Sequence, residues 1–196
     1  MGVPPPCLPP APKLVRYADV PHWIQDNTFI HAGYRPISHS TTACLQSLSY
    51  LHNESVNIYT HLLPSLSILF LSTSLYAFFV SEYPDATLTD RLVLGLFLAG
   101  AAGCFGASAL FHTLCNHSER VCGIWLRVDF VGILVLMETS FVSGVHVAFF
   151  CEREMVRGYI AMVISPLPRH PLSPALMMVV LDACGGVSCG VAEPAV

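Results

Sequence analysis

The sequence has few charged residues and very few basic ones. Of its 196 residues 11% are charged and 54% are hydrophobic, whereas soluble domains carry roughly 25% charged residues. Nine residues are Lys or Arg, against 13 Asp or Glu, so the chain lacks the basic stripe that nucleic-acid binding requires. The composition therefore excludes a nucleic-acid-binding module and indicates a membrane protein.

The sequence also lacks the cysteine spacing of a zinc ribbon or a redox motif. Its eight cysteines are scattered, no two have CxxC spacing, and several lie inside apolar runs. We interpret them as small buried apolar residues and not as a disulfide framework. The first residues, MGVPPPCLPPAPK, have no apolar core of the kind found in cleavable signal peptides. Membrane insertion is therefore expected to depend on the first internal span.

Two segments precede the first long apolar run. Residues 1–21 are rich in proline, which favours extended backbone without a packed core, so we predict a disordered tail. Residues 22–61 are polar with interspersed aromatic rings, and they predict a cytosolic segment at the membrane interface.

A polar helical face is predicted just before the first span. Asn53 is expected to be the N-cap of a helix on which Glu54, Asn57 and His61 share one face. Because polar side chains beside a lipid-length run are costly in lipid, this face is expected to contact other protein. The alternative is that His61 meets only headgroup water.

Three apolar stretches have the length that a membrane span requires. We predict spans at 62–80, 92–115 and 124–150, and the start of a fourth near residue 157, so that 62–164 form the transmembrane region. Pro64 is expected in the first turn or two of its span, where proline is tolerated. Small residues at four-residue steps in the second span predict close approach of another helix. They are Gly95, Ala99, Gly103 and Ala107.

Basic residues are concentrated on one side of the predicted spans. The connection between the first two spans has Arg91 alone, and the positive-inside rule then predicts a multi-pass protein with a cytosolic N-terminus. Two glycosylation sequons, which begin at Asn53 and Asn116, lie on that same side and are expected to stay unmodified. The basic residues on the predicted cytosolic side are Lys13, Arg16, Arg35, Arg120 and Arg127.

Polar side chains end the second span and open the third. Ser108 and His112 are four residues apart, and Asp129 lies early in the next apolar run. A short polar turn between neighbouring helices would bring His112 and Asp129 to the same depth, as a candidate half of a metal site. The sequence leaves alternatives open: an interfacial or a satisfied core His112 instead of a ligand, and an ion pair of Asp129 with Arg127 or Arg120.

These motifs together resemble the progestin and adiponectin receptor family, also called the haemolysin-III-related family. The resemblance covers about residues 26–164. Within the family, the chain most resembles the fungal members implicated in zinc and sterol homeostasis. The similar segments are HNESVNIYTHLL at 52–63, SALFHT at 108–113, RVDFVGI at 127–133 and SFVSGVHVAFFCEREMVRGYI at 140–160.

The resemblance implies an all-α integral membrane fold. This chain would hold the N-terminal part of a seven-helix membrane bundle, with about three complete transmembrane helices. The resemblance also implies one zinc ion near the cytosolic side. His112 would be one ligand, and an HxxxH motif of the last span would supply two more. Ser108 and Asp129 would be associated with the zinc site through a bound water. The implied chemistry is hydrolysis of the amide of ceramide-like lipids, with Asp129 orienting or deprotonating the water. Membrane lipids are the implied partners, as substrate or ligand.

The resemblance ends after Ile164. Residues 165–196 contain several prolines that a continuous span does not accommodate, and His146 and His170 do not form an HxxxH pair. The zinc site is therefore expected to be incomplete in this chain. Glu138 is a second departure, because it adds an acid to the third span. We expect the chain to be a fragment of a zinc-containing membrane receptor or lipid amide hydrolase, inactive in this form. One alternative is a non-enzymatic membrane regulator that acts through partners. The other is a truncated product without function.

Overall fold

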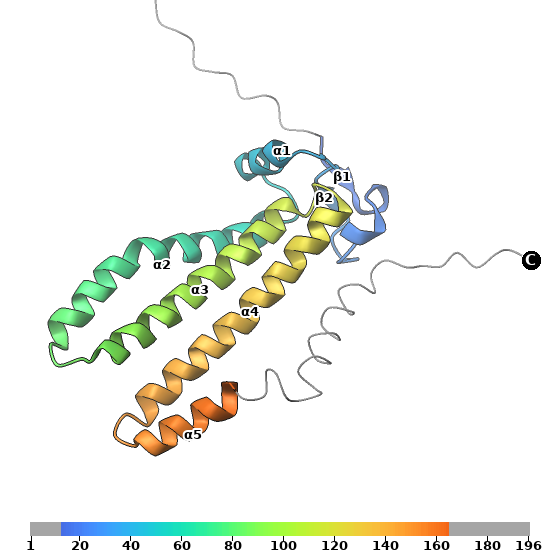
Figure 1. The fold of residues 1–196 in the computed structure, drawn as a ribbon. Helices are drawn as coiled ribbons and strands as arrows, with labels where there is room; N and C mark the ends of the chain where they lie inside the picture. The colour runs from blue at the N-terminus through green and yellow to red at the C-terminus, as the bar shows by residue number, and fades with distance from the viewer. Residues whose placement is uncertain (1–12, 165–196) are drawn as a thin grey trace, which may run out of the picture.

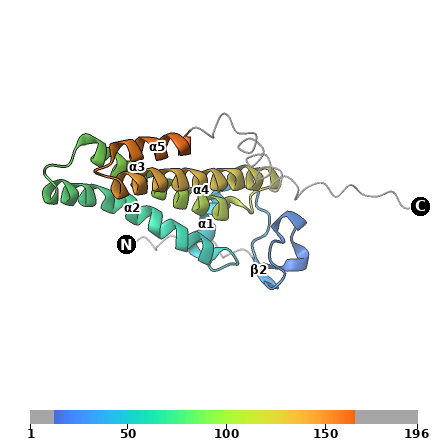
Figure 2. The same ribbon diagram turned by 90° about the horizontal axis from the view of Figure 1, so that it is seen from below.

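The computed structural model describes residues 13–164, which form a helical bundle with a small cap at one end (Figure 1). The bundle has three long antiparallel helices, and a shorter helix lies along the far end of the last one (Figure 2). These helices are α2 (Ser55–Glu82), α3 (Leu88–Leu114), α4 (Glu119–Ala148) and α5 (Arg153–Ile164). The cap contains β1 (Val15–Arg16), η1 (Tyr17–Asp19), η2 (His22–Ile24), β2 (Ala32–Tyr34), α1 (Thr41–Gln46) and η3 (Ser47–Ser49).

Two of these helices, α2 and α3, are long and apolar enough to cross a membrane. Only 6% of the apolar window of α2 and 28% of that of α3 are buried, whereas a core helix of a soluble protein is mostly buried. Helix α4 has 30 residues, but it carries the charged residues Arg127, Asp129 and Glu138. Two of the three predicted complete spans are therefore supported within residues 13–164, and the third is not confirmed.

The first long helix begins earlier than the predicted span of 62–80. Helix α2 starts at Ser55, whose hydroxyl oxygen accepts a hydrogen bond from the backbone N–H of His52 at 2.9 Å. The N-cap position belongs to Glu54 and not to Asn53 as predicted. Because the helix starts at residue 55, Pro64 lies in its third turn, and the prediction that it lies in the first or second turn is wrong.

The other two spans also differ from the helices at their ends. Thr87 and Asp90 form a reciprocal capping box that starts α3 at residue 88, before the predicted 92. Ser118 accepts from the N–H of Val121 and starts α4 at Glu119, so the predicted 124–150 becomes 119–148. The turn between α3 and α4 is therefore shorter than predicted.

Part of the predicted disordered tail belongs to the cap. Strand β1 pairs antiparallel with β2, with Val15 opposite Tyr34, and the ring of Tyr17 meets that of Tyr34 edge-on at 5.9 Å. The prediction for 1–21 is thus wrong for residues 13–21, because a partner strand distant in sequence orders them. The predictions for 1–12 and for 165–196 concern residues outside the described part of the chain.

Small residues let the three long helices approach closely, although not along the predicted stripe. A Cβ on Gly100 would lie 3.2 Å from Cβ of Thr139 in α4, and one on Gly132 would lie 3.1 Å from Cα of Cys104. A Cβ on Gly95 or Gly103 would meet nothing within 4 Å. Ala107 is thus the member of the predicted stripe that faces a close contact, since it lies 3.4 Å from the same position at Gly132.

We predict that Gly100→Ala destabilises the bundle, because the added methyl group overlaps Thr139. Overpacking of this kind costs about 1–3 kcal/mol, and it outweighs the gain in helix propensity of about 1 kcal/mol. Thermal unfolding in detergent micelles, followed by tryptophan fluorescence, should show a lower Tm. Gly103→Ala is the matched control and should keep or raise the Tm; equal effects of the two changes would contradict the packing described.

Candidate functional site

Five polar side chains meet at the end of the bundle that carries the cap. Glu54 precedes α2 and His61 lies in its second turn, while α3 and α4 supply the others. Their side chains are linked by three hydrogen bonds of 2.8–3.2 Å. We call this set the polar cluster: Glu54, His61, Ser108, His112 and Asp129.

Ser108 joins the other two helices to α3. Its hydroxyl donates to Asp129 Oδ2 at 3.2 Å and contacts His61 Nδ1 at 2.8 Å. A serine hydroxyl has one hydrogen, so when it is donated to the Asp129 carboxylate, His61 must donate its own Nδ1–H to Ser108. The polar cluster therefore includes His61 as a hydrogen-bonded member, and the alternative of contact with headgroup water alone is wrong.

Of the predicted site residues, Ser108 contacts Asp129, whereas His112 contacts Glu54, which is not among them. Ser108, one helical turn from His112, holds Asp129 directly, and within residues 13–164 Asp129 forms no ion pair with Arg127 or Arg120. His112 is a largely buried, hydrogen-bonded histidine, as the core alternative requires. Its side chain is 19% exposed and its Nδ1 lies 2.8 Å from Glu54 Oε2.

Glu54 is a buried carboxylate with several donors. Besides His112, the side-chain amides of Asn53 and Asn57 donate to its two oxygens at 2.7 and 2.9 Å. Burial by itself would raise the pKa of Glu54, but the hydrogen bonds from His112 and Asn57 outweigh it and hold the pKa below the ordinary value. The carboxylate is therefore ionised at neutral pH and available as an acceptor for His112.

Arg35 fixes the end of α3 that carries His112. Its guanidinium donates to the backbone oxygens of His112 and Thr113 at 2.6 and 2.9 Å and to Ser47 Oγ at 2.8 Å. The last carbonyls of a helix lack intrahelical partners and favour a nearby cation. Sequence reasoning used Arg35 only as a charge for orientation, and no local signal could reveal contacts 77 and 78 residues away.

His52 lies beside Arg35 and Glu54. Its Nδ1 accepts from the backbone N–H of Glu54 at 3.1 Å, and its buried Nε2 has no partner within the described residues. Burial, together with the nearby guanidinium of Arg35, lowers the pKa of His52 from 6.5 to about 4. His52 is therefore neutral at physiological pH.

One member of the polar cluster fits a metal-ligand position. A ligating histidine commonly donates its second ring N–H to a carboxylate, and the contact of His112 with Glu54 has that form. A complete site needs more: across residues 13–164, no three His, Cys, Asp or Glu side chains gather closely enough to hold a metal ion. The described residues thus supply one ligand position and its supporting carboxylate.

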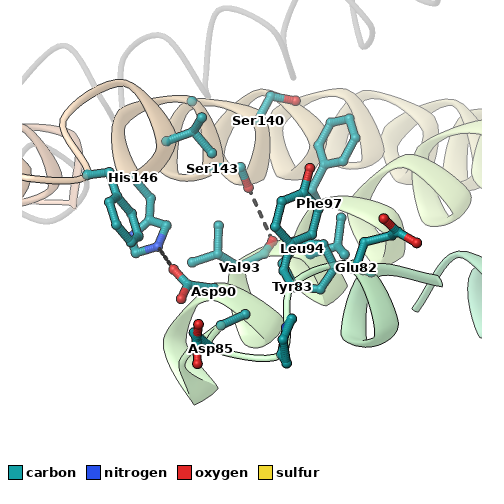
Figure 3. Close-up of a pocket in the computed structure, with 16 residues that line it drawn as sticks. Glu82, Tyr83, Asp85, Asp90, Val93, Leu94, Phe97, Ser140, Ser143 and His146 are labelled. Carbon is teal, nitrogen blue, oxygen red and sulfur yellow. Dashed lines mark hydrogen bonds and ion pairs between the residues drawn. The ribbon is translucent and has the colours of Figure 1, made fainter. Parts of the chain in front are cut away.

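A cavity of about 810 Å³ lies at the opposite end of the bundle, between the α2–α3 connection, α3 and α4 (Figure 3). At its edge His146 Nε2 lies 2.6 Å from Asp90 Oδ1, and the Ser143 hydroxyl donates to the backbone oxygen of Val93 at 3.2 Å. These contacts tie the start of α3 to the end of α4. None of the predicted site residues lines this cavity.

We predict that Arg35→Met detaches the cap from α3, because it leaves two carbonyls and the Ser47 hydroxyl without their donor. Unsatisfied buried groups cost about 1–3 kcal/mol each. Limited proteolysis in detergent should cut residues 13–50 much faster than in the unaltered chain. Arg16→Met, at an exposed position, is the control, and unchanged cleavage of the Arg35 variant would refute this role.

We also predict that His52 makes stability depend on pH. The folded-state pKa of about 4 lies below the ordinary value of 6.5, so the unfolded chain binds more protons and stability falls as pH drops from 6.5 toward 4. Asn can accept the same N–H bond without titrating. Between pH 7.5 and 5 the Tm of the unaltered chain should therefore fall by several degrees more than that of His52→Asn. Parallel curves would contradict the prediction.

Comparison with known proteins places the sequence in a family. The sequence profile described as haemolysin-III related matches residues 49–166. The chain is 38% identical over 153 residues to Progestin and adipoQ receptor-like protein 1 of Caenorhabditis elegans, across 77% of this chain and 34% of that protein. It is 38% identical over 141 residues to ADIPOR-like receptor IZH2 of Saccharomyces cerevisiae, across 70% of this chain and 43% of that protein.

A third relative is the Adiponectin receptor protein of Drosophila melanogaster, which is 35% identical over 151 residues, across 77% of this chain and 33% of that protein. The matched part of this chain thus spans between 33% and 43% of the length of these three relatives. The family predicted from the four motifs is confirmed. The chain belongs to the haemolysin-III-related family of membrane proteins, which includes the progestin and adiponectin receptor-like proteins.

Proposed function

We propose that the polar cluster is one side of a zinc site in a multi-pass membrane receptor or hydrolase that acts on ceramide-like lipids. The observation that carries the proposal is the convergence of Ser108, His112 and Asp129 at one end of the bundle, with His112 backed by a buried carboxylate. Zinc would be held by the free ring nitrogen of His112, with the remaining ligands from outside the described residues. The receptor-like names of the relatives support a role in signalling.

The residues of this chain have separate tasks in the proposed site. When bound, zinc would supply Lewis acidity that makes a water a better nucleophile toward an amide carbonyl. Asp129 is the acceptor for the proton of that water, and the hydroxyl of Ser108 holds the carboxylate at 3.2 Å. His61 holds the hydroxyl in turn from α2. We place this end of the bundle in the cytosol, because five of the eight Lys and Arg residues within 13–164 lie toward it.

A second candidate is a non-enzymatic regulator of membrane lipid or zinc balance that acts through partners. One observation favours it: residues 13–164 do not gather a complete set of metal ligands. In that case His112 and Asp129 would stabilise the junction of α3 and α4 without binding zinc. Measurements of zinc and of hydrolysis together separate the two candidates.

The test uses the full chain, purified in mild detergent with zinc present. Because residues 13–164 supply an incomplete set of ligands, we expect the unaltered chain to bind zinc weakly, measured by equilibrium dialysis, and His112→Ala to bind less. His117→Ala is the matched control, since this neighbouring histidine contacts Ser118 outside the polar cluster. Equal zinc content in the unaltered chain and in His112→Ala would overturn the metal site.

Hydrolysis is measured on a fluorescent short-chain ceramide in the same detergent. The hydrolase proposal expects release of the labelled fatty acid, with a loss of at least about tenfold in Asp129→Asn, because a positioned general base contributes roughly 10²–10⁴-fold. Zinc binding without any hydrolysis would favour a zinc-binding receptor over a hydrolase, and the absence of both would favour the non-enzymatic candidate. Hydrolysis that persists unchanged in Asp129→Asn would exclude Asp129 as the proton acceptor.

A further inference from the structure

We propose that Glu54 is a positioning residue that selects the tautomer of His112, which leaves the Nε2 lone pair free to bind a ligand. This inference rests on the proposed function for the identity of that ligand. The tautomer itself follows from contacts in this chain alone. Sequence reasoning placed Glu54 on the same helical face as His61 but gave it no role.

The contact between the two residues has a defined donor. A carboxylate only accepts hydrogen bonds, so at the distance of 2.8 Å His112 must donate its Nδ1–H to Glu54 Oε2. A neutral imidazole has one N–H, and Nε2 therefore keeps its lone pair. A metal ion or a proton donor can bind only to a nitrogen in this state.

Glu54 is itself held in place. Asn53 donates to Oε1 at 2.7 Å and Asn57 donates to Oε2 at 2.9 Å, and the residue is 8% exposed. These bonds leave the carboxylate little freedom to rotate away from His112. The two asparagines thus orient the carboxylate, and the carboxylate orients the ring of His112.

The backbone of His112 is fixed independently of its ring. Arg35 holds the His112 carbonyl at 2.6 Å, so loss of the Glu54 carboxylate should change the ring and not the end of α3. This separation distinguishes a positioning role from a purely structural one. It also means that a variant of Glu54 can be tested in a folded protein.

The tautomer is measured by ¹⁵N NMR of the full chain in micelles without metal, with ¹⁵N-labelled histidine and His112 assigned by comparison with His112→Asn. We expect an Nδ1–H signature for His112 in the unaltered chain. In Glu54→Gln the amide can donate to Nδ1, so the signature should shift toward Nε2–H. Glu82→Gln, at the exposed end of the same helix, is the control and should leave it unchanged.

Zinc affinity is the second readout. It should fall roughly 10–100-fold in Glu54→Gln and much less in Asn57→Ala, which keeps the carboxylate and serves if Glu54→Gln does not fold. An Nε2–H signature in the unaltered chain, or an unchanged Nδ1–H signature in Glu54→Gln, would overturn the inference. The expected NMR result with no zinc binding by the unaltered chain would leave the tautomer assignment standing and overturn the proposed zinc site.

Discussion

The guanidinium of Arg35, buried against the last carbonyls of α3, is the contact on which the arrangement of this end of the molecule depends. The side chain is 2% exposed and bonds the carbonyls of two successive residues, His112 and Thr113. It thereby anchors the cap to the bundle and fixes the backbone from which the ring of His112 extends. A cation in this place also complements the negative end of the α3 dipole.

Buried charge at this end is balanced within a few side chains. Arg35 is positive and Glu54 negative, and the guanidinium helps to hold the pKa of the Glu54 carboxyl below its ordinary value. His52 lies next to both and stays neutral, because burial and the guanidinium oppose its protonation. Arg35 and His52 thus lie beside the Glu54 carboxylate of the polar cluster, one as a cation and the other as a neutral ring.

Much of this arrangement could be predicted from the sequence, since it depends on short-range spacing. The separation of four residues between Ser108 and His112 and the short turn before Asp129 are enough to place them together. The helix ends could not be predicted, because side chains such as Ser118 decide them through individual hydrogen bonds. Nor could the role of Arg35, which depends on contacts between distant parts of the chain.

Side-chain hydrogen bonds join α3 to α4 near both ends, between Ser108 and Asp129 and between Asp90 and His146. The two α3 residues in these bonds, Asp90 and Ser108, are 18 residues apart. This separation is about 27 Å along a helix, which is close to the thickness of the hydrocarbon core of a membrane. In the described part of the chain, no side-chain hydrogen bond joins α2 to α3 beyond Ser65. Within residues 13–164, side-chain hydrogen bonds therefore join α2 to α3 only near the end that carries Glu54, His61 and Ser65, so a tilt of α2 that kept these bonds would displace its opposite end most.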